Sequence, residues 1–275
     1  MTESTVGALV TRDAIRLESV SASPLLDCQI IACHILGRNR AWLYAHDDSS
    51  FSDLQRSCYD SLINRRLAGE PVAYLTGERE FWDRSFRVSP ATLIPRPETE
   101  LLVTTLLERF DNSPRIVADL GTGSGAIAVC LAVERPGWQV TGIDSSKDAL
   151  RIAEENGRGL QNLEFREGHW CRGLRPGSVD IIVTNPPYVR EGDPHLAFLS
   201  FEPRGALTAG KDGLVAIREI IDSGYDCLRA GGCLMTEHGY DQQRDVVSLM
   251  TARGYREIEV FADLDGTPRA VLARR

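Results

Sequence analysis

Hydrophobic residues in the first ~75 positions recur with the period of an α-helix, and turn residues separate the segments. Ser23-Pro24 predicts the start of one helix, because serine can cap the free amides of a first turn and proline lacks the N–H that would be unpaired there. A second helix is predicted over residues 52–67, before Gly69. The region contains neither a glycine-rich loop nor a cluster of catalytic residue types, so we interpret it as a small helical domain for packing or partner docking.

Residues 78–97 follow a different pattern. In FWDRSFRVSPATLIPRP, aromatic or apolar residues alternate with polar ones, as in a β-hairpin, and prolines flank Arg96 at its end. We therefore expect residues 78–97 to form a hairpin that links the helical domain, residues 1–77, to a second domain.

From residue 98 onward, predicted strands and helices alternate, which is typical of a mostly parallel sheet with helices on both faces. The expected strands are residues 116–120, 138–144, 163–167, 179–184, 232–238, 256–261 and 269–273. The expected helices are residues 98–110, 124–134, 146–157, 211–229 and 241–253. Residues 98–275 are thus predicted to form one seven-stranded α/β domain.

Composition narrows the class of protein. The 275 residues are 43% hydrophobic and 25% charged, which is ordinary for a globular protein in water. No apolar run approaches the ~20 residues that span a bilayer, and the N-terminus lacks the layout of a secretion signal. The seven cysteines form no C-x-x-C pair, which argues against a disulfide framework or a zinc site. We expect a reduced, cytoplasmic protein with no metal and no membrane contact.

The strand at 116–120 runs directly into the glycine-rich stretch GTGSGA at 121–126, and a predicted helix follows. Glycines permit a tight turn and a close approach of a ligand to the backbone, and the helix offers its first amides to a polar group. Asp144 ends the next strand, where a carboxylate can accept bonds from both hydroxyls of a ribose. The pattern predicts an adenosine-containing ligand, and at this point a nicotinamide cofactor fits as well as any other.

The tetrapeptide Asn185-Pro186-Pro187-Tyr188 follows the strand at 179–184 and separates these alternatives. Adjacent prolines remove two N–H donors and keep Asn185 and Pro186 extended, so the Pro186 carbonyl stays free of a helix or sheet. With the side-chain oxygen of Asn185, the loop presents two acceptors at the carboxyl end of a strand. Two acceptors that hold both hydrogens of a planar –NH2 group orient its nitrogen and favour its nucleophilic form, while Tyr188 can cover its flat face. Transfer of a methyl group to that nitrogen then depends mainly on alignment in a dry pocket.

The stretches GTGSGAIA, GIDSS and NPPYV resemble those of class I, Rossmann-like methyltransferases that use S-adenosyl-L-methionine and act on exocyclic or amide nitrogens. LIPRPETE at 93–100, FEPRGALTAGKDGL at 201–214 and EHGYDQ at 237–242 resemble the HemK/PrmC family more narrowly, and so do DCQIIACHILG and RRLAGEPVAYLTGEREFW in the first part of the chain. This resemblance covers nearly the whole chain. It implies methylation of glutamine N5 in the Gly-Gly-Gln motif of class I peptide chain release factors, with S-adenosyl-L-homocysteine as product and the helical domain as a docking domain. We expect a monomer.

The resemblance also implies roles for individual residues. Asn185 would touch both the cofactor and the glutamine, and Asn185, Pro186 and Tyr188 would be catalytic. The glutamine would be held by Asn185, Pro186, Pro187 and Tyr188. The cofactor would be bound by Gly121, Thr122, Gly123, Ser124, Gly125, Asp144, Trp170 and Asn185.

Two positions depart from the family pattern. Asp83 stands where many relatives have glycine, which puts the turn of the hairpin in doubt. His169 stands where an acid often contacts the adenine amino group, and we interpret it as a bystander. Arg96, Glu98 and Glu100 are interpreted as anchors for the Pro-Arg-Pro segment. Asp119 is expected to support the glycine loop, and nothing in the chemistry requires Glu237 or His238.

Three alternatives remain open. An adenine-N6 methyltransferase of DNA or RNA shares the NPPY chemistry, but a net charge of −8 weighs against a nucleic acid partner, because binding to phosphates needs a basic face. A glutamine methyltransferase of a ribosomal protein would usually depart from RPETE after Pro-Arg. A nicotinamide-dependent oxidoreductase explains the glycine loop and Asp144 and leaves NPPY without a role.

Overall fold

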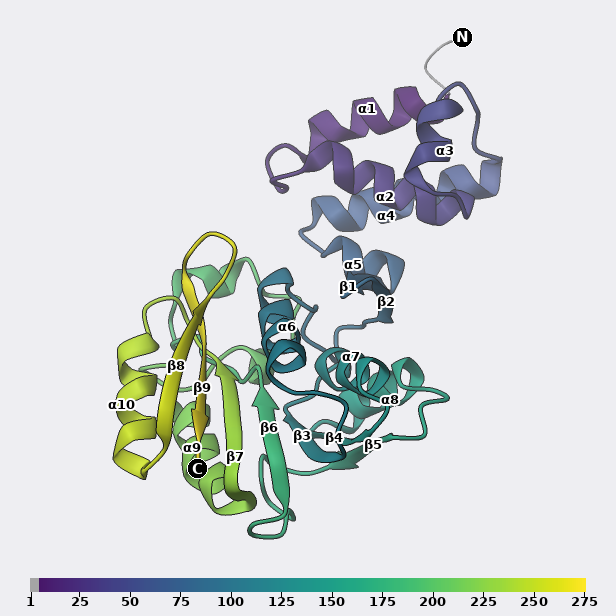
Figure 1. Ribbon diagram of the computed structural model, residues 1–275. Helices are drawn as coiled ribbons and strands as arrows, with labels where there is room; N and C mark the ends of the chain where they lie inside the picture. The colour runs from purple at the N-terminus through teal and green to yellow at the C-terminus, as the bar shows by residue number, and fades with distance from the viewer. Residues whose placement is uncertain (1–4) are drawn as a thin grey trace. The chain divides into compact units, whose positions relative to one another are not determined.

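The computed structural model describes residues 5–275, so residues 1–4 of the predicted helical domain lie outside the described residues. The chain divides into two compact units, Met1–Glu78 and Arg79–Arg275 (Figure 1). The first unit contains the helices α1 (Val6–Leu17), α2 (Pro24–Leu36), α3 (Arg40–Ala45), α4 (Asp53–Leu67) and α5 (Val72–Thr76).

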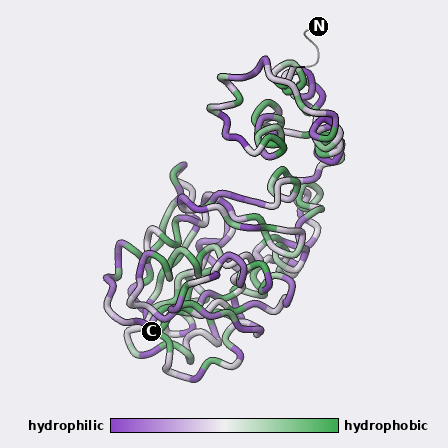
Figure 2. The backbone as a smooth tube through the Cα atoms, turned by 90° about the vertical axis from the view of Figure 1, so that its right-hand side faces the viewer, coloured by the Kyte–Doolittle hydropathy of each residue, from purple (hydrophilic) through white to green (hydrophobic). Residues whose placement is uncertain are grey.

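The helices of the first unit carry both hydrophobic and hydrophilic positions (Figure 2) and enclose a hydrophobic core of their own. Ser52 caps α4 through a capping box with Gln55, in which each side chain bonds the other residue's backbone N–H. The prediction that Ser23 caps α2 is wrong: its backbone lies at φ −138° and ψ 61°, away from the extended form that capping requires, and its hydroxyl makes no capping bond. Pro24 does begin that helix, as expected.

The predicted hairpin is present but shorter than residues 78–97. Its strands are β1 (Glu78–Phe81) and β2 (Arg84–Arg87), and residues 88–96 continue as a loop, where Pro90 and Pro95 cannot donate to a ladder. Trp82 and Asp83 form the turn with φ of 51° and 54°, the left-handed pair typical of a type I′ hairpin turn. Aspartate tolerates this conformation better than most residues, so the turn forms without glycine.

The second unit is built on a seven-stranded sheet, with the order β5-β4-β3-β6-β7-β9-β8, which confirms the predicted α/β fold. Its strands are β3 (Arg115–Leu120), β4 (Trp138–Asp144), β5 (Leu163–Glu167), β6 (Val179–Thr184), β7 (Leu228–Glu237), β8 (Arg256–Ala262) and β9 (Pro268–Arg274). The five strands from β5 to β7 pair in parallel, and β9 runs antiparallel to both β7 and β8. All parallel strands therefore end at one edge, where ligands of such sheets bind.

Helices cover both faces of the sheet (Figure 1). Residues that alternate along β3 face opposite cores: Val117 packs in the core with α6 and α7, and Leu120 packs in the core with α9 and α10. The α-helices of this unit are α6 (Glu100–Arg109), α7 (Ala126–Glu134), α8 (Lys147–Asn156), α9 (Val215–Cys227) and α10 (Gln243–Arg253). Short 3-10 turns are η1 (Pro97–Thr99), η2 (Pro194–Ala197) and η3 (Arg204–Ala206).

Candidate active site

The glycine loop joins β3 to α7 at the carboxyl edge of the sheet. The backbone N–H groups of Gly121 and Thr122 donate to the carbonyl of Ile143, at 2.8 and 3.0 Å, and so tie the loop to β4. Gly121 and Gly123 take φ of 69° and 56°, which side chains rarely adopt. A Cβ atom on Gly121 would lie 3.1 Å from Trp170 Cζ3, so only glycine leaves this wall open.

The structure gives the loop residues different positions. Gly121 and Gly123 line a cavity, whereas Thr122, Ser124 and Gly125 are not among its lining residues. The Thr122 hydroxyl donates to Asp119, at 2.6 Å. A Cβ on Gly125 would lie 3.1 Å from Phe165, so this glycine serves the packing of the loop against β5. The sequence had assigned all five residues to the cofactor.

Asp144 lies at the end of β4 and lines the same cavity. Its two carboxylate oxygens accept one backbone N–H each, from Gly123 at 2.8 Å and from Ser146 at 2.9 Å. A carboxylate oxygen can accept a second bond, so Asp144 is oriented by the backbone and still able to accept from a ligand.

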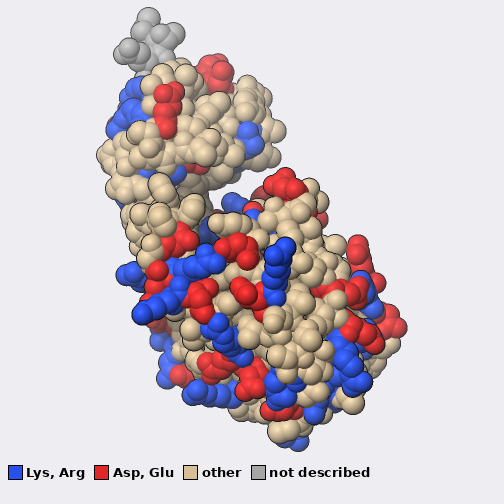
Figure 3. All heavy atoms as spheres, turned by 90° about the vertical axis from the view of Figure 1, so that its left-hand side faces the viewer, with Lys and Arg blue, Asp and Glu red and all other residues tan. Residues whose placement is uncertain are grey.

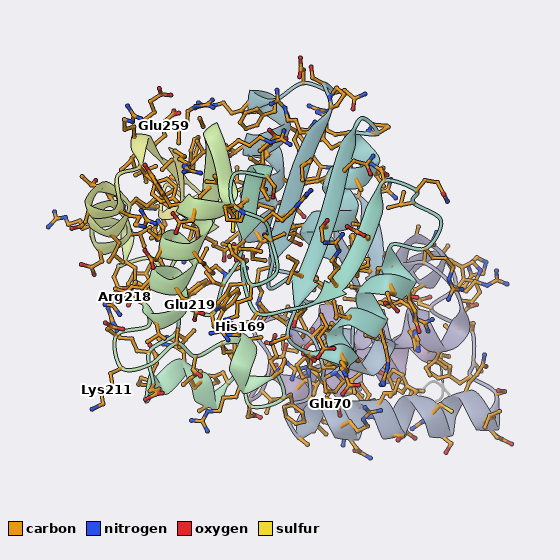
Figure 4. All side chains as sticks on the ribbon, turned by 90° about the horizontal axis from the view of Figure 1, so that it is seen from below. Glu70, His169, Lys211, Arg218, Glu219 and Glu259 are labelled. Carbon is orange, nitrogen blue, oxygen red and sulfur yellow. The ribbon has the colours of Figure 1, made fainter. Side chains whose placement is uncertain are left out.

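Trp170 and His169 form the opposite part of the wall, after β5. Trp170 takes a φ of 49°, an uncommon conformation for a large side chain, which is typical of functional sites. His169, which the sequence analysis set aside, also lines the cavity, and its Nδ1 lies 3.2 Å from Glu219 of α9 (Figure 4). The adjacent Trp170 was the available signal for its position.

The cavity has a volume of about 290 Å³, which is at the lower end of the range for small-molecule sites. Two segments with no predicted role at the cofactor complete its wall: residues 91–93 from the loop after β2, and Pro203, Gly205 and Ala206 around η3. Residues 203–206 belong to the stretch FEPRGALTAGKDGL, which carried the family resemblance but no predicted contact with the cofactor.

Asn185 and Pro187 reach the same cavity, and Asn185 also lines a smaller cavity of about 90 Å³. Pro186 and Tyr188 lie on the wall of the smaller cavity. The two cavities share Leu93, Asn185 and Ala206. The predicted tetrapeptide therefore stands where a larger and a smaller cavity meet.

A buried chain of hydrogen bonds lies behind Asn185. Its Nδ2 donates to Thr99 Oγ1 at 2.9 Å, and Thr99 Oγ1 donates to Glu237 Oε2 at 2.8 Å. The Tyr188 hydroxyl donates to the other oxygen of Glu237 at 3.0 Å. Thr99 and Glu237 are 5% and 2% exposed. Thr99 lies within the RPETE stretch but had no role predicted from its sequence.

Two carboxyl groups near the site are fully enclosed. Burial raises the pKa of Asp119 to about 7, and the bonds from Thr122 and from the Ala128 amide oppose this rise only in part. Burial likewise raises the pKa of Glu237 to about 7, against the bonds from Thr99 and Tyr188. Burial and the adjacent Glu237 also raise the pKa of the Tyr188 phenol, so Tyr188 stays neutral and cannot serve as a base.

The RPETE stretch is anchored as the sequence predicted for Glu100, whose carboxylate accepts the Trp82 amide at 3.1 Å and ties the hairpin to α6. Arg96 forms an ion pair with the buried Glu202, which also accepts the Ile94 amide. Arg96 also lines the smaller cavity, so the ion pair with Glu202 holds the Arg96 side chain at the candidate site. Among residues 5–275, no group of three or more His, Cys, Asp or Glu side chains could hold a metal ion.

The arrangement is suited to holding two polar groups side by side. The larger cavity offers a carboxylate, flat aromatic surface and open backbone, and the smaller one offers neutral acceptors and a phenol ring. The residues that line the smaller cavity include no carboxylate or imidazole that could act as a base, which favours reactions that depend on alignment over proton abstraction.

Comparisons with known proteins agree with this geometry. Residues 11–77 match the family described as PrmC N-terminal domain, and residues 97–200 match the Methyltransferase small domain. The release factor glutamine methyltransferase of Coxiella burnetii is 44% identical, over 94% of this chain and 95% of its own. That of Burkholderia pseudomallei is 46% identical, with the same two coverages.

Among solved structures, a methyltransferase from Pyrococcus furiosus has a TM-score of 0.54 at 16% identity, covering 77% of this chain and 96% of its own. That likeness shows the methyltransferase fold alone. The similarity to the two bacterial relatives covers 94% of the chain and therefore extends over both of its units. The chain belongs to the family of release factor glutamine methyltransferases.

Proposed function

We propose that the chain methylates the side-chain amide nitrogen (N5) of the glutamine in the Gly-Gly-Gln motif of class I peptide chain release factors. The methyl donor is S-adenosyl-L-methionine, and S-adenosyl-L-homocysteine is the product. The observation that carries the proposal is the position of Asn185 at the junction of the two cavities. A methyl group held in the larger cavity and an amide held in the smaller one would meet at this residue.

The larger cavity has the features that this donor requires. Asp144 would accept the ribose hydroxyls, Trp170 would lie against the adenine, and Gly121 and Gly123 leave space for the remainder of the molecule. Asn185 would contact it from the substrate side. Thr122, Ser124 and Gly125 would shape the loop from behind. When bound, the cofactor supplies an electrophilic methyl group on a positively charged sulfur.

The chain's own residues would then position the glutamine. Because the Asn185 amide nitrogen is engaged by Thr99, its Oδ1 is free to accept one hydrogen of the glutamine amide. The Pro186 carbonyl would accept the other, and Pro187 and the Tyr188 ring would cover the flat amide group. The two acceptors align the nitrogen for in-line transfer and exclude water from it. Such fixed acceptors contribute typically 10²–10³-fold to a rate.

The first unit has its own core and no assigned chemistry. We propose that residues 1–77 dock the release factor, that residues 78–97 link, and that residues 98–275 carry out the reaction. A nucleic acid substrate is disfavoured, because acidic and basic side chains are interspersed on the face of the second unit shown in Figure 3. All seven cysteines are free, as is usual in a reducing cytoplasm, and we propose a cytoplasmic monomer.

The described residues contain no helix long and apolar enough to cross a membrane.

The experiment that tests the function is transfer of a radiolabelled methyl group from S-adenosyl-L-methionine. The acceptors are a purified release factor, the same factor with the Gly-Gly-Gln glutamine changed to alanine, a short Gly-Gly-Gln peptide, and adenine-containing duplex DNA. Label on the intact factor alone supports the proposal. Label on both the factor and the peptide supports it as well, if the KM for the factor is lower than the KM for the peptide. Label on DNA, or on the factor without its glutamine, contradicts it.

A variant tests the mechanism. Asn185→Ala is expected to lose most of the activity, roughly 10²-fold or more, while its melting temperature stays close to that of the parent. Turnover near that of the parent would contradict the role of the amide.

A further inference from the structure

We propose that Thr99 and Glu237 are positioning residues, which determine that the oxygen of the Asn185 amide, and not its nitrogen, faces the substrate. This inference rests on the proposed function for its kinetic consequence. The orientation of the amide itself can be measured without any substrate.

The register of the sheet brings the three residues together. β6 and β7 are parallel, and Thr184 pairs with Thr236. Asn185 directly follows β6 and Glu237 is the last residue of β7, so both stand at the carboxyl edge of the sheet. Thr99 reaches the same point from the turn before α6, although it lies 86 residues from Asn185 and 138 from Glu237 in the sequence.

The direction of each hydrogen bond follows from the donors available. In its ionised form, which dominates above its pKa of about 7, the Glu237 carboxylate only accepts, and the hydroxyls of Thr99 and Tyr188 then both donate to it. A hydroxyl has a single hydrogen, and that of Thr99 is then used. Toward Asn185, Thr99 can only accept, and the partner must be the –NH2 side of the amide. The oxygen of Asn185 is thereby directed to the other side.

The backbone of Thr99 supports this assignment independently. Thr99 stands at the N-cap of α6, where a threonine usually bonds a free amide of the first turn. Its φ of −68° and ψ of −19° are helical, not extended, and its side chain makes no capping bond. Because the hydroxyl is not committed to the helix, it is free for Glu237 and Asn185.

The opposite orientation would disable the grip on the substrate. A rotated Asn185 would present –NH2 to the –NH2 of a glutamine, which places donor against donor and leaves the substrate nitrogen unaligned. An asparagine alone has no reason to prefer one orientation, since its two ends have nearly the same shape. Glu237 removes this ambiguity because, of the four side chains in the hydrogen-bond chain, only its ionised carboxylate has no hydrogen to donate.

Three variants separate positioning from structure. Thr99→Val keeps the shape and removes the hydroxyl, and Thr99→Ser keeps the hydroxyl. Glu237→Gln keeps the shape and introduces a donor that can reverse the chain of bonds. Each is to be compared with the parent for melting temperature, affinity for S-adenosyl-L-homocysteine, and kcat and KM for the release factor.

We expect Thr99→Val and Glu237→Gln to lower kcat by about 10- to 100-fold, since misplaced reacting groups cost up to about 10²-fold. The affinity for S-adenosyl-L-homocysteine should stay within about twofold, because Asp144 and Trp170 are unchanged. Thr99→Ser should retain kcat within about threefold of the parent. The inference is overturned if Thr99→Val keeps the parent kcat, or if Thr99→Ser is as impaired as Thr99→Val.

The amide orientation is also to be read by NMR, with the side-chain –NH2 of Asn185 assigned in the parent and in Thr99→Val. The parent should show slow hydrogen exchange of that group and a nuclear Overhauser contact to the Thr99 side chain, and the variant should exchange faster. Equal, fast exchange in both would overturn the inference. If the parent methylated no release factor, the proposed function would fail, and the NMR result would still decide the positioning role.

Discussion

Gly213 gives the sharpest test of how the NPPY loop is held in place. It takes a φ of 73° in the segment before α9, and a Cβ placed there would press on the backbone carbonyl of Tyr188 and lie 2.7 Å from Gln242 Nε2. Gln242 Nε2 donates to that same carbonyl at 3.0 Å. Gly213→Ala would therefore push directly on the end of the NPPY loop.

The size of the effect follows from the geometry. Real Cβ atoms keep at least 3.0 Å from such atoms, so the Tyr188 carbonyl must move by more than about half an ångström. A misplacement of about 1 Å can cost about 10²-fold in rate, so we expect kcat to fall about 10-fold or more. The left-handed backbone adds a cost of about 1–2 kcal/mol in stability.

Gly210→Ala is the matched control. Gly210 has a φ of 74°, almost the same strain, but its Cβ would meet only a methyl group of Val215, at 2.7 Å, which can move aside. Both variants should lose similar stability in urea denaturation, and only Gly213→Ala should lose kcat in the methyl-transfer assay at saturating cofactor. Equal kcat in the two variants would refute the reasoning.

Three further predictions concern single carboxyl groups. Asp144→Ala should weaken binding of S-adenosyl-L-homocysteine by about 10-fold or more in calorimetry, since charged hydrogen bonds contribute about 1.5–3 kcal/mol. Asp148→Ala, at a residue that does not line the cavity, should leave the affinity unchanged, and equal affinities of the two variants would contradict the ribose assignment. Asp83→Gly should raise stability by about 0.5–1 kcal/mol by relieving its φ of 54°, and Asp148→Gly in α8 should lower it similarly; a lower melting temperature for the first would count against strain in the turn. Asp119 and Glu237 bind protons in the folded state up to about pH 7, above their usual pKa, so the folded state holds more protons than the unfolded chain and their contribution to the free energy of unfolding falls as pH rises from about 4 to 7. In urea denaturation between pH 4 and 7, the free energy of unfolding of Asp119→Asn and of Glu237→Gln should fall less steeply with pH than that of the parent. Slopes equal to that of the parent would refute the raised pKa values.

Much of the site could be predicted from short stretches of sequence. The glycine loop, Asp144 and the NPPY tetrapeptide each follow a predicted strand, and the chemistry of each depends on its own backbone and immediate neighbours. Parallel strands end at one edge, so these segments had to converge once the strands were recognised. The same local logic located α4 and the start of α2, where capping and proline act within one turn.

Local patterns say less where a residue's contacts depend on the fold. Thr122 and Ser124 have the residue types of a cofactor loop, and in the structure both are buried and the Thr122 hydroxyl bonds Asp119, so their contact with the cofactor stays a prediction. His169, which looked like a bystander, lies on the cavity wall beside Glu219.

The sequence by itself therefore determined the succession of strands and helices and the places of the glycine loop and the NPPY tetrapeptide, because these depend on hydrophobic period, glycine and proline acting over a few residues. Only the tertiary structure decided which side chains stand behind them. Strand register and loop packing bring together partners that lie tens of residues apart in the sequence: Thr99 with Asn185, Glu202 with Arg96, and Glu237 with Thr99 and Tyr188. No local pattern encodes such meetings, since a buried hydrogen bond is fixed by the fold that removes its groups from water.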